Sequence, residues 1–153
     1  TRNETSAARS AGAIAGAIAG ATFPVMIAGI GTDIVAVARL GELYERHGQR
    51  ALSKLLSPAE CAEFVGIRDP ARYLAKRFAA KEAFGKALGI GLVAPATMPS
   101  IGIAHDSLGK PYFEYAAALA AHLEQQRLLA HVSISDERDF AIAFVVMELM
   151  EPK

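Results

Sequence analysis

Hydrophobic residues recur with two different spacings along this chain, and each spacing predicts a different kind of element. Residues 25–35 read VMIAGIGTDIV, with β-branched residues and no charge before Asp33, and this run predicts a strand. Farther along, apolar residues return every three or four positions, which predicts helices. The expected helices cover residues 36–47, residues 57 to about 66, and residues 69–89.

The second half of the chain has shorter apolar runs separated by turn residues. Two short strands are expected on either side of the turn HDSLGK, and a last hairpin is expected around a charged turn at 136–139. The expected ranges are 101–104 and 111–115 for the two strands, 116–129 for an alanine-rich helix with Leu119, Leu123 and Leu128 buried, and 131–135 and 140–148 for the hairpin. This order predicts an α+β fold, with helices packed on an antiparallel or mixed sheet.

The first strand carries an unusual set of residues on one face. Alternation places Gly29, Gly31 and Asp33 together, so the aspartate has neighbours without side chains. Glycine inside a strand weakens it and often marks the close approach of a ligand or of another part of the backbone. The sequence leaves both explanations open for Gly29 and Gly31.

Composition limits the class of protein. The chain has 153 residues, of which 52% are hydrophobic and 21% charged, so it has the length of one globular domain. Sixteen basic residues balance sixteen acidic ones, which gives no support for nucleic-acid binding. The single cysteine, Cys61, fits a reducing cytoplasm.

Residues 1–24 differ from the rest of the chain. The run AGAIAGAIAGA at 11–21 is shorter than the ~20 apolar residues that a membrane span needs, and it is a poor export signal because alanine and glycine are weakly hydrophobic. We therefore expect a low-complexity N-terminal extension at 1–24, a functional domain at 25–153, and no membrane partner.

The stretch FAAKEAFGKALG at 78–89 holds the most informative pair of residues. Glu82 and Lys86 are four positions apart and project from one face of the helix, whereas Phe84 and Leu88 form its buried stripe. Such a pair is most often a solvated salt bridge. It also places a metal ligand beside a cation that is able to bind phosphate.

Two other segments give this pair partners, and together the segments resemble a known family. The strand GIGTDIV, the helix LAKRFAAKEAFGKALG, the turn GKP and the late strand HVSISDE occur in the order seen in the holo-acyl-carrier-protein synthases, the small 4′-phosphopantetheinyl transferases. The resemblance spans residues 26–148 and implies the fold of that family, a mostly antiparallel sheet with helices packed on it, in its single-lobe form.

The resemblance implies a reaction and a metal. The phosphopantetheine arm of coenzyme A would move to a serine of an apo acyl carrier protein, releasing adenosine 3′,5′-bisphosphate. Asp33 and Glu82 would hold Mg²⁺, a hard ion that commonly binds through one or two carboxylates and substrate phosphates. The base for the serine would be Glu82 or a metal-bound water.

The remaining roles also follow from the resemblance. Lys86 and His131 would contact the coenzyme A phosphates and take part in catalysis. His131 would face the same way as Ser133 and Ser135, away from the core. Further coenzyme A contacts are expected from the turn residues Gly109, Lys110 and Pro111.

The family pattern also implies protein partners. Its carrier proteins are acidic, and they would dock on Arg39, with Arg46 and Arg50 extending the basic surface. Members are typically homotrimers with coenzyme A bound between neighbouring subunits. Many members carry a glutamate where this chain has Ala36, so the coordination of the metal is expected to differ in detail.

Two alternatives stay open at the level of sequence. The first is a scaffold of the same fold that binds a carrier protein or coenzyme A without turnover. The second is an α+β interaction domain whose motif match is accidental. The sequence also leaves open whether the carrier belongs to fatty-acid or polyketide synthesis.

Overall fold

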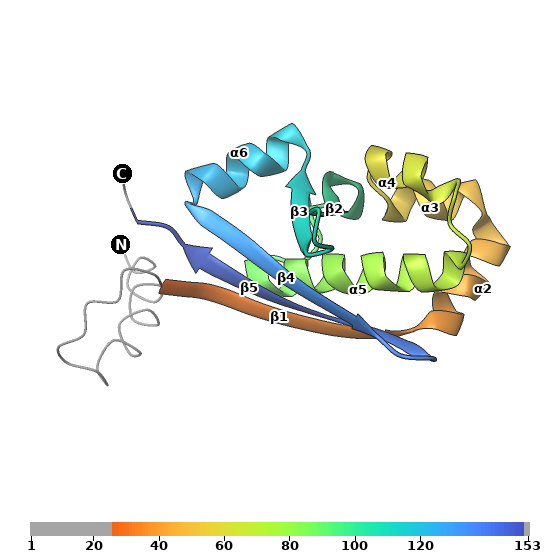
Figure 1. Ribbon diagram of the computed structural model, residues 1–153. Coiled ribbons are helices and arrows are strands. Elements are labelled where there is room, and N and C mark those ends of the chain that lie inside the picture. The colour runs from red at the N-terminus through yellow and green to blue at the C-terminus, as the bar shows by residue number, and fades with distance from the viewer. Residues whose placement is uncertain (1–25, 152–153) are drawn as a thin grey trace, which may run out of the picture.

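The computed structural model describes residues 26–151, which form one layered unit (Figure 1). The expected extension at 1–24 lies outside these residues, so its structure is not described. Within residues 26–151, no helix combines the length and the apolarity that a bilayer crossing requires. The elements are β1 (Met26–Ala36), α2 (Val37–His47), α3 (Gln49–Leu55), α4 (Pro58–Phe64), α5 (Pro70–Leu88), a 3₁₀ turn η1 (Met98–Ser100), β2 (Ile101–His105), β3 (Pro111–Tyr115), α6 (Ala117–Gln125), β4 (Leu128–Asp136) and β5 (Phe140–Leu149).

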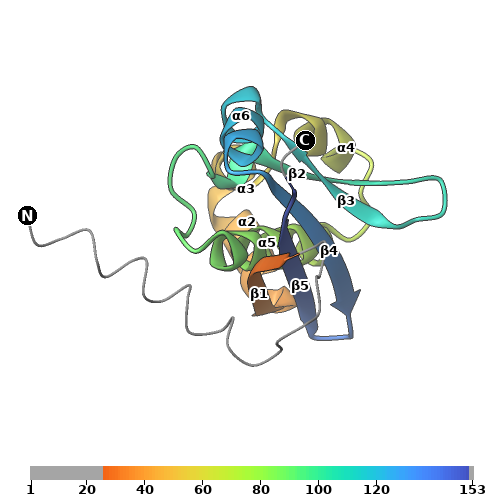
Figure 2. The same ribbon diagram turned by 90° about the vertical axis from the view of Figure 1, so that its left-hand side faces the viewer.

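A three-stranded antiparallel sheet and a two-stranded hairpin lie on opposite sides of α5. The sheet has the order β1-β5-β4, and β2 pairs with β3. Figures 1 and 2 show α5 running along the sheet, with the hairpin and the shorter helices on its other side. Phe84 of α5 faces the hairpin, where its ring centroid lies 5.1 Å from that of Phe113. The α+β fold with an antiparallel sheet is therefore confirmed.

The two strand glycines allow β1 to lie directly on α5. A Cβ atom at Gly29 would overlap the backbone carbonyl of Ala87, and one at Gly31 would overlap that of Ala83. Any side chain at these positions would push the strand and helix apart. The structure thus explains both glycines by close packing of backbone on backbone.

The helix boundaries follow the expected local chemistry. Ser57 and Glu60 form a capping box at the start of α4, in which each side chain binds the other residue's backbone amide. Asp69 caps α5, and Gly89 ends it with φ +83°, a left-handed conformation that favours glycine. The short helix α3 was not expected from the sequence, and it follows α2 directly after Gly48.

One helix prediction is wrong at its end. The helix expected over residues 116–129 stops at Gln125, and Arg127 takes a φ of +55°, which reverses the chain. Leu128 then starts β4, where it pairs with Leu149 of β5 instead of packing on the helix. Leu119 and Leu123 are buried on α6 as expected. The apolar pattern continues past Gln125, but there the residues pair in the sheet, so the pattern predicted too long a helix.

Candidate functional site

The close contact between β1 and α5 brings together three of the expected site residues. Asp33 ends the glycine-bearing face of β1, and Glu82 and Lys86 lie on the facing part of α5. Lys86 Nζ donates hydrogen bonds to Asp33 Oδ1 at 2.9 Å and to the Thr32 carbonyl at 2.8 Å. Lys86 therefore pairs with Asp33 across the two elements, and no salt bridge to Glu82 is found within the described part of the chain.

Glu82 of α5 is influenced by the charges of three other residues around the site. Burial and the negative charge of Asp33 raise the pKa of Glu82, and the positive charges of Lys86 and Arg39 partly oppose that rise. Two carboxylates that raise each other's pKa are stabilised by a cation that both contact. Oxygen donors of this kind suit a hard ion such as Mg²⁺.

The donor set alone is too small for a complete metal cage. Within residues 26–151, no group of three or more histidine, cysteine or carboxylate residues is placed to hold a metal. Magnesium commonly completes its six ligands with waters and substrate phosphates, so Asp33 and Glu82 fit a site of that kind. The residue expected to differ from the family, Ala36, caps α2 without a side-chain hydrogen bond and adds no donor.

The residue that precedes Glu82 in sequence, Lys81, takes part in a buried ion pair. The Lys81 side chain has no exposed surface, and Lys81 Nζ donates to Glu60 Oε2 and to the Leu55 carbonyl, each at 2.6 Å. Glu60 also accepts from the backbone amides of Ser57 and Ile103, both at 2.9 Å. This carboxylate therefore joins α4, β2 and α5.

Sequence reasoning assigned Glu60 only to its helix cap and did not single out Lys81. Burial lowers the pKa of Lys81, and the charge of Glu60 opposes that effect. The only available signal was the helical spacing, which places Lys81 away from Glu82 and toward the core. The spacing does not reveal a partner on another helix.

The expected docking residues lie on the exposed side of α2. The Arg39 guanidinium carbon sits 5.3 Å from the ring centroid of Phe78, which is one helical turn before Glu82. Arg46 forms a loose pair with Glu42 at 3.9 Å, with both side chains largely exposed. A hollow of about 190 Å³ lies among Arg39, Arg46 and Phe78. The basic surface therefore begins beside the carboxylate site.

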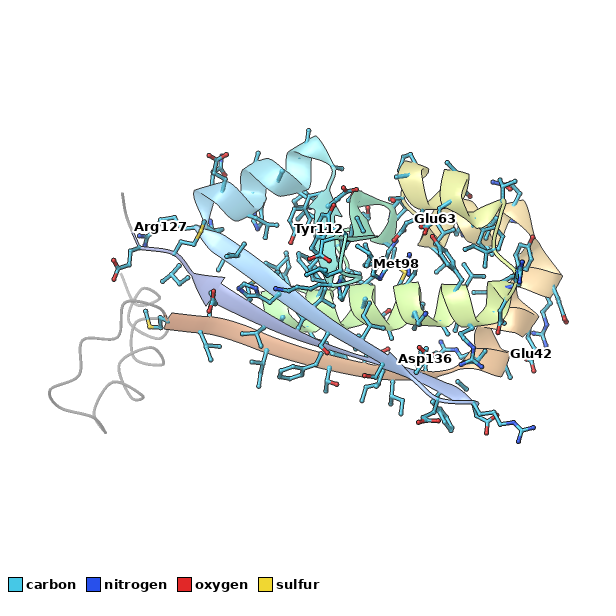
Figure 3. The ribbon with its side chains drawn as sticks, viewed as in Figure 1. Glu42, Glu63, Met98, Tyr112, Arg127 and Asp136 are labelled. Atoms are coloured by element: carbon cyan, nitrogen blue, oxygen red, sulfur yellow. The ribbon has the colours of Figure 1, made fainter. Side chains whose placement is uncertain are left out.

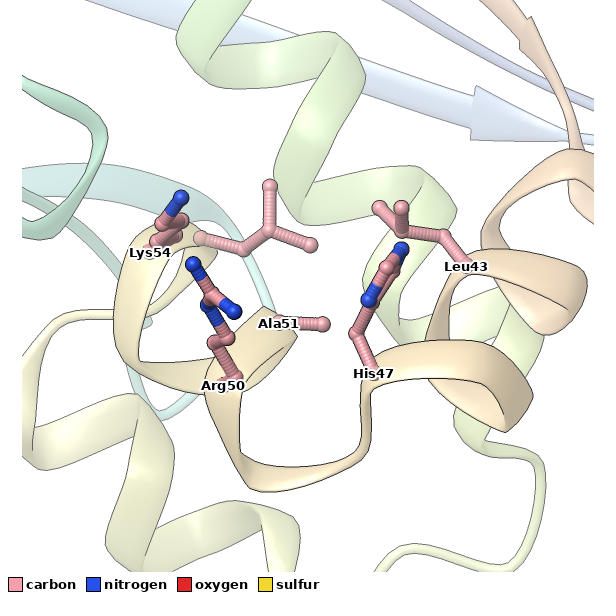
Figure 4. Close-up of a pocket in the computed structure, with 6 residues that line it drawn as sticks. Leu43, His47, Arg50, Ala51 and Lys54 are labelled. Carbon is pink, nitrogen blue, oxygen red and sulfur yellow. The ribbon is translucent and has the colours of Figure 1, made fainter.

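A larger hollow continues this surface between α2 and α3 (Figure 4). It has a volume of about 340 Å³, an apolar floor, and basic residues around its edge. The lining residues are Leu43, His47, Arg50, Ala51, Lys54 and Leu55. Sequence reasoning missed this feature except for Arg50, because α3 itself was not expected.

The turn GKP joins β2 to β3 and is held by local hydrogen bonds. Gly109 has a φ of +84°, and the Asp106 carboxylate accepts from the backbone amides of Leu108 and Lys110, both at 2.9 Å. At the end of β2, burial lowers the pKa of His105, and the positive charge of Arg77 lowers it further. Among the described residues, no hydrogen bond joins this turn to Asp33 or Lys86.

His131 lies on the opposite face of the sheet from Asp33. Across the sheet, His131 is level with Val146 and Ile30, whereas Asp33 is level with Ala143 and faces α5. The His131 ring instead pairs with the Glu148 carboxylate, with Nε2 and Oε2 2.8 Å apart. Ser133 and Ser135 are exposed on the same side, as expected. One chain therefore brings Asp33, Glu82 and Lys86 together but leaves His131 apart.

Comparison with known proteins identifies the family. The model of the 4′-phosphopantetheinyl transferase superfamily matches residues 29–145. The chain belongs to this superfamily. A similar relative is the holo-[acyl-carrier-protein] synthase of Dechloromonas aromatica (strain RCB), 58% identical over 123 residues, which cover 80% of this chain and 98% of the relative.

Solved structures of transferases from this superfamily share the fold. The crystal structure of holo-[acyl-carrier-protein] synthase from Neisseria meningitidis aligns with a TM-score of 0.78 and 49% identity, covering 80% of this chain and 98% of the other. The Helicobacter pylori synthase in complex with coenzyme A aligns with a TM-score of 0.67 and 30% identity, covering 77% and 98%. An accidental motif match in an unrelated interaction domain is therefore excluded.

Proposed function

We propose that this protein is a holo-acyl-carrier-protein synthase, which transfers the 4′-phosphopantetheine arm of coenzyme A to a serine of an apo acyl carrier protein. The observation that carries this proposal is the meeting of Asp33, Glu82 and Lys86 at the contact between β1 and α5. Relatives at 50–58% identity are named for this activity, and a structural neighbour binds coenzyme A.

The residues of the site divide the work of the reaction. The serine oxygen attacks the phosphorus that bears the pantetheine arm, the bond to the bridging oxygen breaks, and adenosine 3′,5′-bisphosphate leaves with the electron pair. Asp33 and Glu82 would hold Mg²⁺, which would neutralise charge on the diphosphate. The Lys86 ammonium, which is half exposed, is placed to bind a phosphate oxygen and balance the charge of the leaving group.

The serine proton must leave during the same step. Glu82 is the candidate acceptor among the protein's own side chains, because it is a carboxylate at the site where the serine would attack. A water at the site is the alternative acceptor.

The basic surface of α2 and α3 fits an acidic carrier protein. Arg39 lies close enough to Glu82 to influence its pKa, so a carrier bound at Arg39 would have its serine near the carboxylate site. Arg46, Arg50 and Lys54 extend the positive charge along the two helices. The apolar floor between Arg50 and Lys54 would accept an apolar side chain of the carrier. Opposite charges at the edge would guide the encounter.

A homotrimer would bring His131 of one chain close to Asp33 of another, although the two residues lie on opposite faces of the sheet within one chain. The sheet face that carries His131 also exposes large apolar residues, and Figure 3 shows side chains extending from the sheet on the side away from α5. These residues are Ile30, Ile34, Leu129, Phe140, Ile142 and Phe144. A contiguous apolar face of this kind is typical of a subunit interface. His131 of one chain would then reach coenzyme A bound at Asp33 of the next.

The domain limits and the location are also proposals. A family match that begins at residue 29 supports a transferase domain at 25–153 preceded by an extension at 1–24. The substrates and the single cysteine, Cys61, support action in the cytoplasm.

The decisive experiment measures the mass of the carrier. The protein is incubated with apo acyl carrier protein, coenzyme A and Mg²⁺, and the carrier should gain the mass of one phosphopantetheine group. The gain should vanish in Asp33→Ala and in Glu82→Ala. Binding of coenzyme A by the unaltered protein without any mass gain would favour the scaffold alternative and overturn the enzymatic proposal.

A further inference from the structure

Lys86 holds the same carboxylate that the metal would use. Its ammonium makes two bonds to β1, one to Asp33 Oδ1 and one to the Thr32 carbonyl, and these fix its position although the side chain is 53% exposed. Asp33 is the more buried partner, with 17% of its side chain exposed. Within residues 26–151, Lys86 is the only cation in a salt bridge with Asp33.

The Lys86 ammonium beside Asp33 must repel a metal ion that binds the same carboxylate. Two unit charges about 4 Å apart in water-like surroundings repel enough to weaken binding about fivefold, and a divalent ion doubles that energy. A diphosphate reverses the situation, because its negative charge attracts both the metal and the ammonium. Lys86 therefore disfavours the metal in the free protein and favours the complex that contains both metal and coenzyme A.

We infer that Lys86 is the residue that makes divalent-metal binding at Asp33 depend on the diphosphate of coenzyme A. This inference rests on the proposed function, because it takes Asp33 as a metal ligand and coenzyme A as the substrate. By linkage, the metal must strengthen coenzyme A binding by the same factor as coenzyme A strengthens metal binding. Lys86 thus sets the coupling between the two ligands in addition to its contact with phosphate.

The test measures Mn²⁺ binding, with Mn²⁺ standing in for Mg²⁺ as a spectroscopic probe. The full chain is titrated with Mn²⁺ alone and again with saturating coenzyme A, and free Mn²⁺ is followed by electron paramagnetic resonance. In Lys86→Met, the affinity of the free protein for Mn²⁺ should rise roughly 30-fold, and the gain caused by coenzyme A should shrink. In Lys86→Gln, which keeps a hydrogen-bond donor without the charge, the same change is expected.

A matched control lies on the same helix. Lys76 also pairs with an aspartate, with its Nζ 3.6 Å from Asp136 Oδ1, but ten positions before Lys86. Lys76→Met should leave the Mn²⁺ affinity of the free protein unchanged, and Asp33→Asn should abolish the tightening in the Lys86→Met background. Circular dichroism verifies that each variant is folded.

Three results would overturn the inference: an unchanged or weaker Mn²⁺ affinity in Lys86→Met, wild-type behaviour in Lys86→Gln, or no Mn²⁺ binding by the unaltered protein even with coenzyme A. The proposed function is judged separately, because it depends on the mass gain of the carrier. A normal mass gain with an unchanged Mn²⁺ affinity in Lys86→Met would reject the coupling role and keep the transferase.

Discussion

Gly31 of β1 lies against the backbone carbonyl of Ala83 on α5, with no room between them for a side chain. Gly31 is two residues before Asp33, and Ala83 follows Glu82. The contact therefore sets the separation of the two carboxylates that we assign to the metal. Glycine at position 31 is therefore needed for the close approach of β1 and α5 at the site.

Gly31→Ala should destabilise the protein and reduce its activity. The added methyl group would have to push rigid backbone away, and overpacking of this kind costs about 1–3 kcal/mol. The movement would also separate Asp33 from Glu82, so the Mg²⁺ concentration needed for half-maximal activity should rise. Urea unfolding and a Mg²⁺ titration of the transferase activity measure the two effects.

A matched control for this substitution is Gly66→Ala. A Cβ at Gly66 would come no closer than 4.0 Å to the Glu63 carbonyl, so the protein should keep its stability and its response to Mg²⁺. Equal unfolding midpoints for Gly31→Ala and Gly66→Ala would contradict the packing argument.

The buried pair of Glu60 and Lys81 should respond differently to single and double substitution. Lys81→Met leaves Arg77 as the remaining cation beside the buried Glu60 carboxylate, with Arg77 Nε 3.4 Å from Glu60 Oε1, and breaking a buried ion pair from one side costs up to about 3–5 kcal/mol. Glu60→Gln combined with Lys81→Met removes both charges, so the double variant should be more stable than the sum of the single effects predicts. Thermal and urea unfolding of the four proteins give the coupling energy. A strictly additive result would show that the two charges do not interact.

The sequence correctly predicted the two elements that carry the proposed site residues. Asp33, Glu82 and Lys86 each lie in a motif, and their strand and helix were expected with nearly correct ends. The pairing of Lys86 with Asp33 instead of Glu82 was not predictable, because helical spacing describes only neighbours on one helix. The partnership of Glu60 with Lys81 was missed for the same reason.

The order of the strands in the sheet was the second feature that the sequence did not predict. Alternation correctly placed His131 on the exposed face of its strand, but alternation does not tell which face of the sheet this is relative to Asp33. That relation depends on β5 lying between β1 and β4. Local signals also failed at α3, which has neither a side-chain cap nor a proline at its start.

Reversing the charge of Arg39 should weaken the binding of the carrier protein much more than the binding of coenzyme A. Arg39→Glu places a negative charge beside Phe78 on the surface where an acidic carrier would dock, so the KM for the carrier should rise about tenfold or more. The KM for coenzyme A should change little. Initial rates with each substrate varied in turn separate the two constants.

Arg127→Glu is the control for net charge. Arg127 lies at the start of β4, far along the chain from α2, and its carbonyl accepts a bond from the Met150 amide. The same change of charge there should leave both KM values unaltered. A rise of both constants by the same factor in Arg39→Glu would exclude a docking role for Arg39.

His105 should make the protein less stable in mild acid. Burial, with a smaller contribution from Arg77, lowers the pKa of His105 below its ordinary value in the folded protein. The unfolded chain then binds the proton more readily, so the free energy of unfolding falls as the pH drops below about 6.5. His105→Gln should reduce the loss of stability between pH 7 and pH 5, as measured by urea unfolding at both values. Identical losses in the two proteins would show that His105 does not contribute.

Mixing two inactive variants tests whether each site is shared by two chains. Asp33→Ala removes a proposed metal ligand and His131→Ala removes the residue on the other sheet face, so each variant alone should have little activity. When the two chains are refolded together, a site that takes Asp33 from one chain and His131 from its neighbour is intact in about a quarter of cases. The mixture should therefore recover about a quarter of the unaltered activity, with sedimentation confirming three chains per particle. If each chain used its own His131, no mixed particle would contain an intact site, and the mixture would stay as inactive as its components.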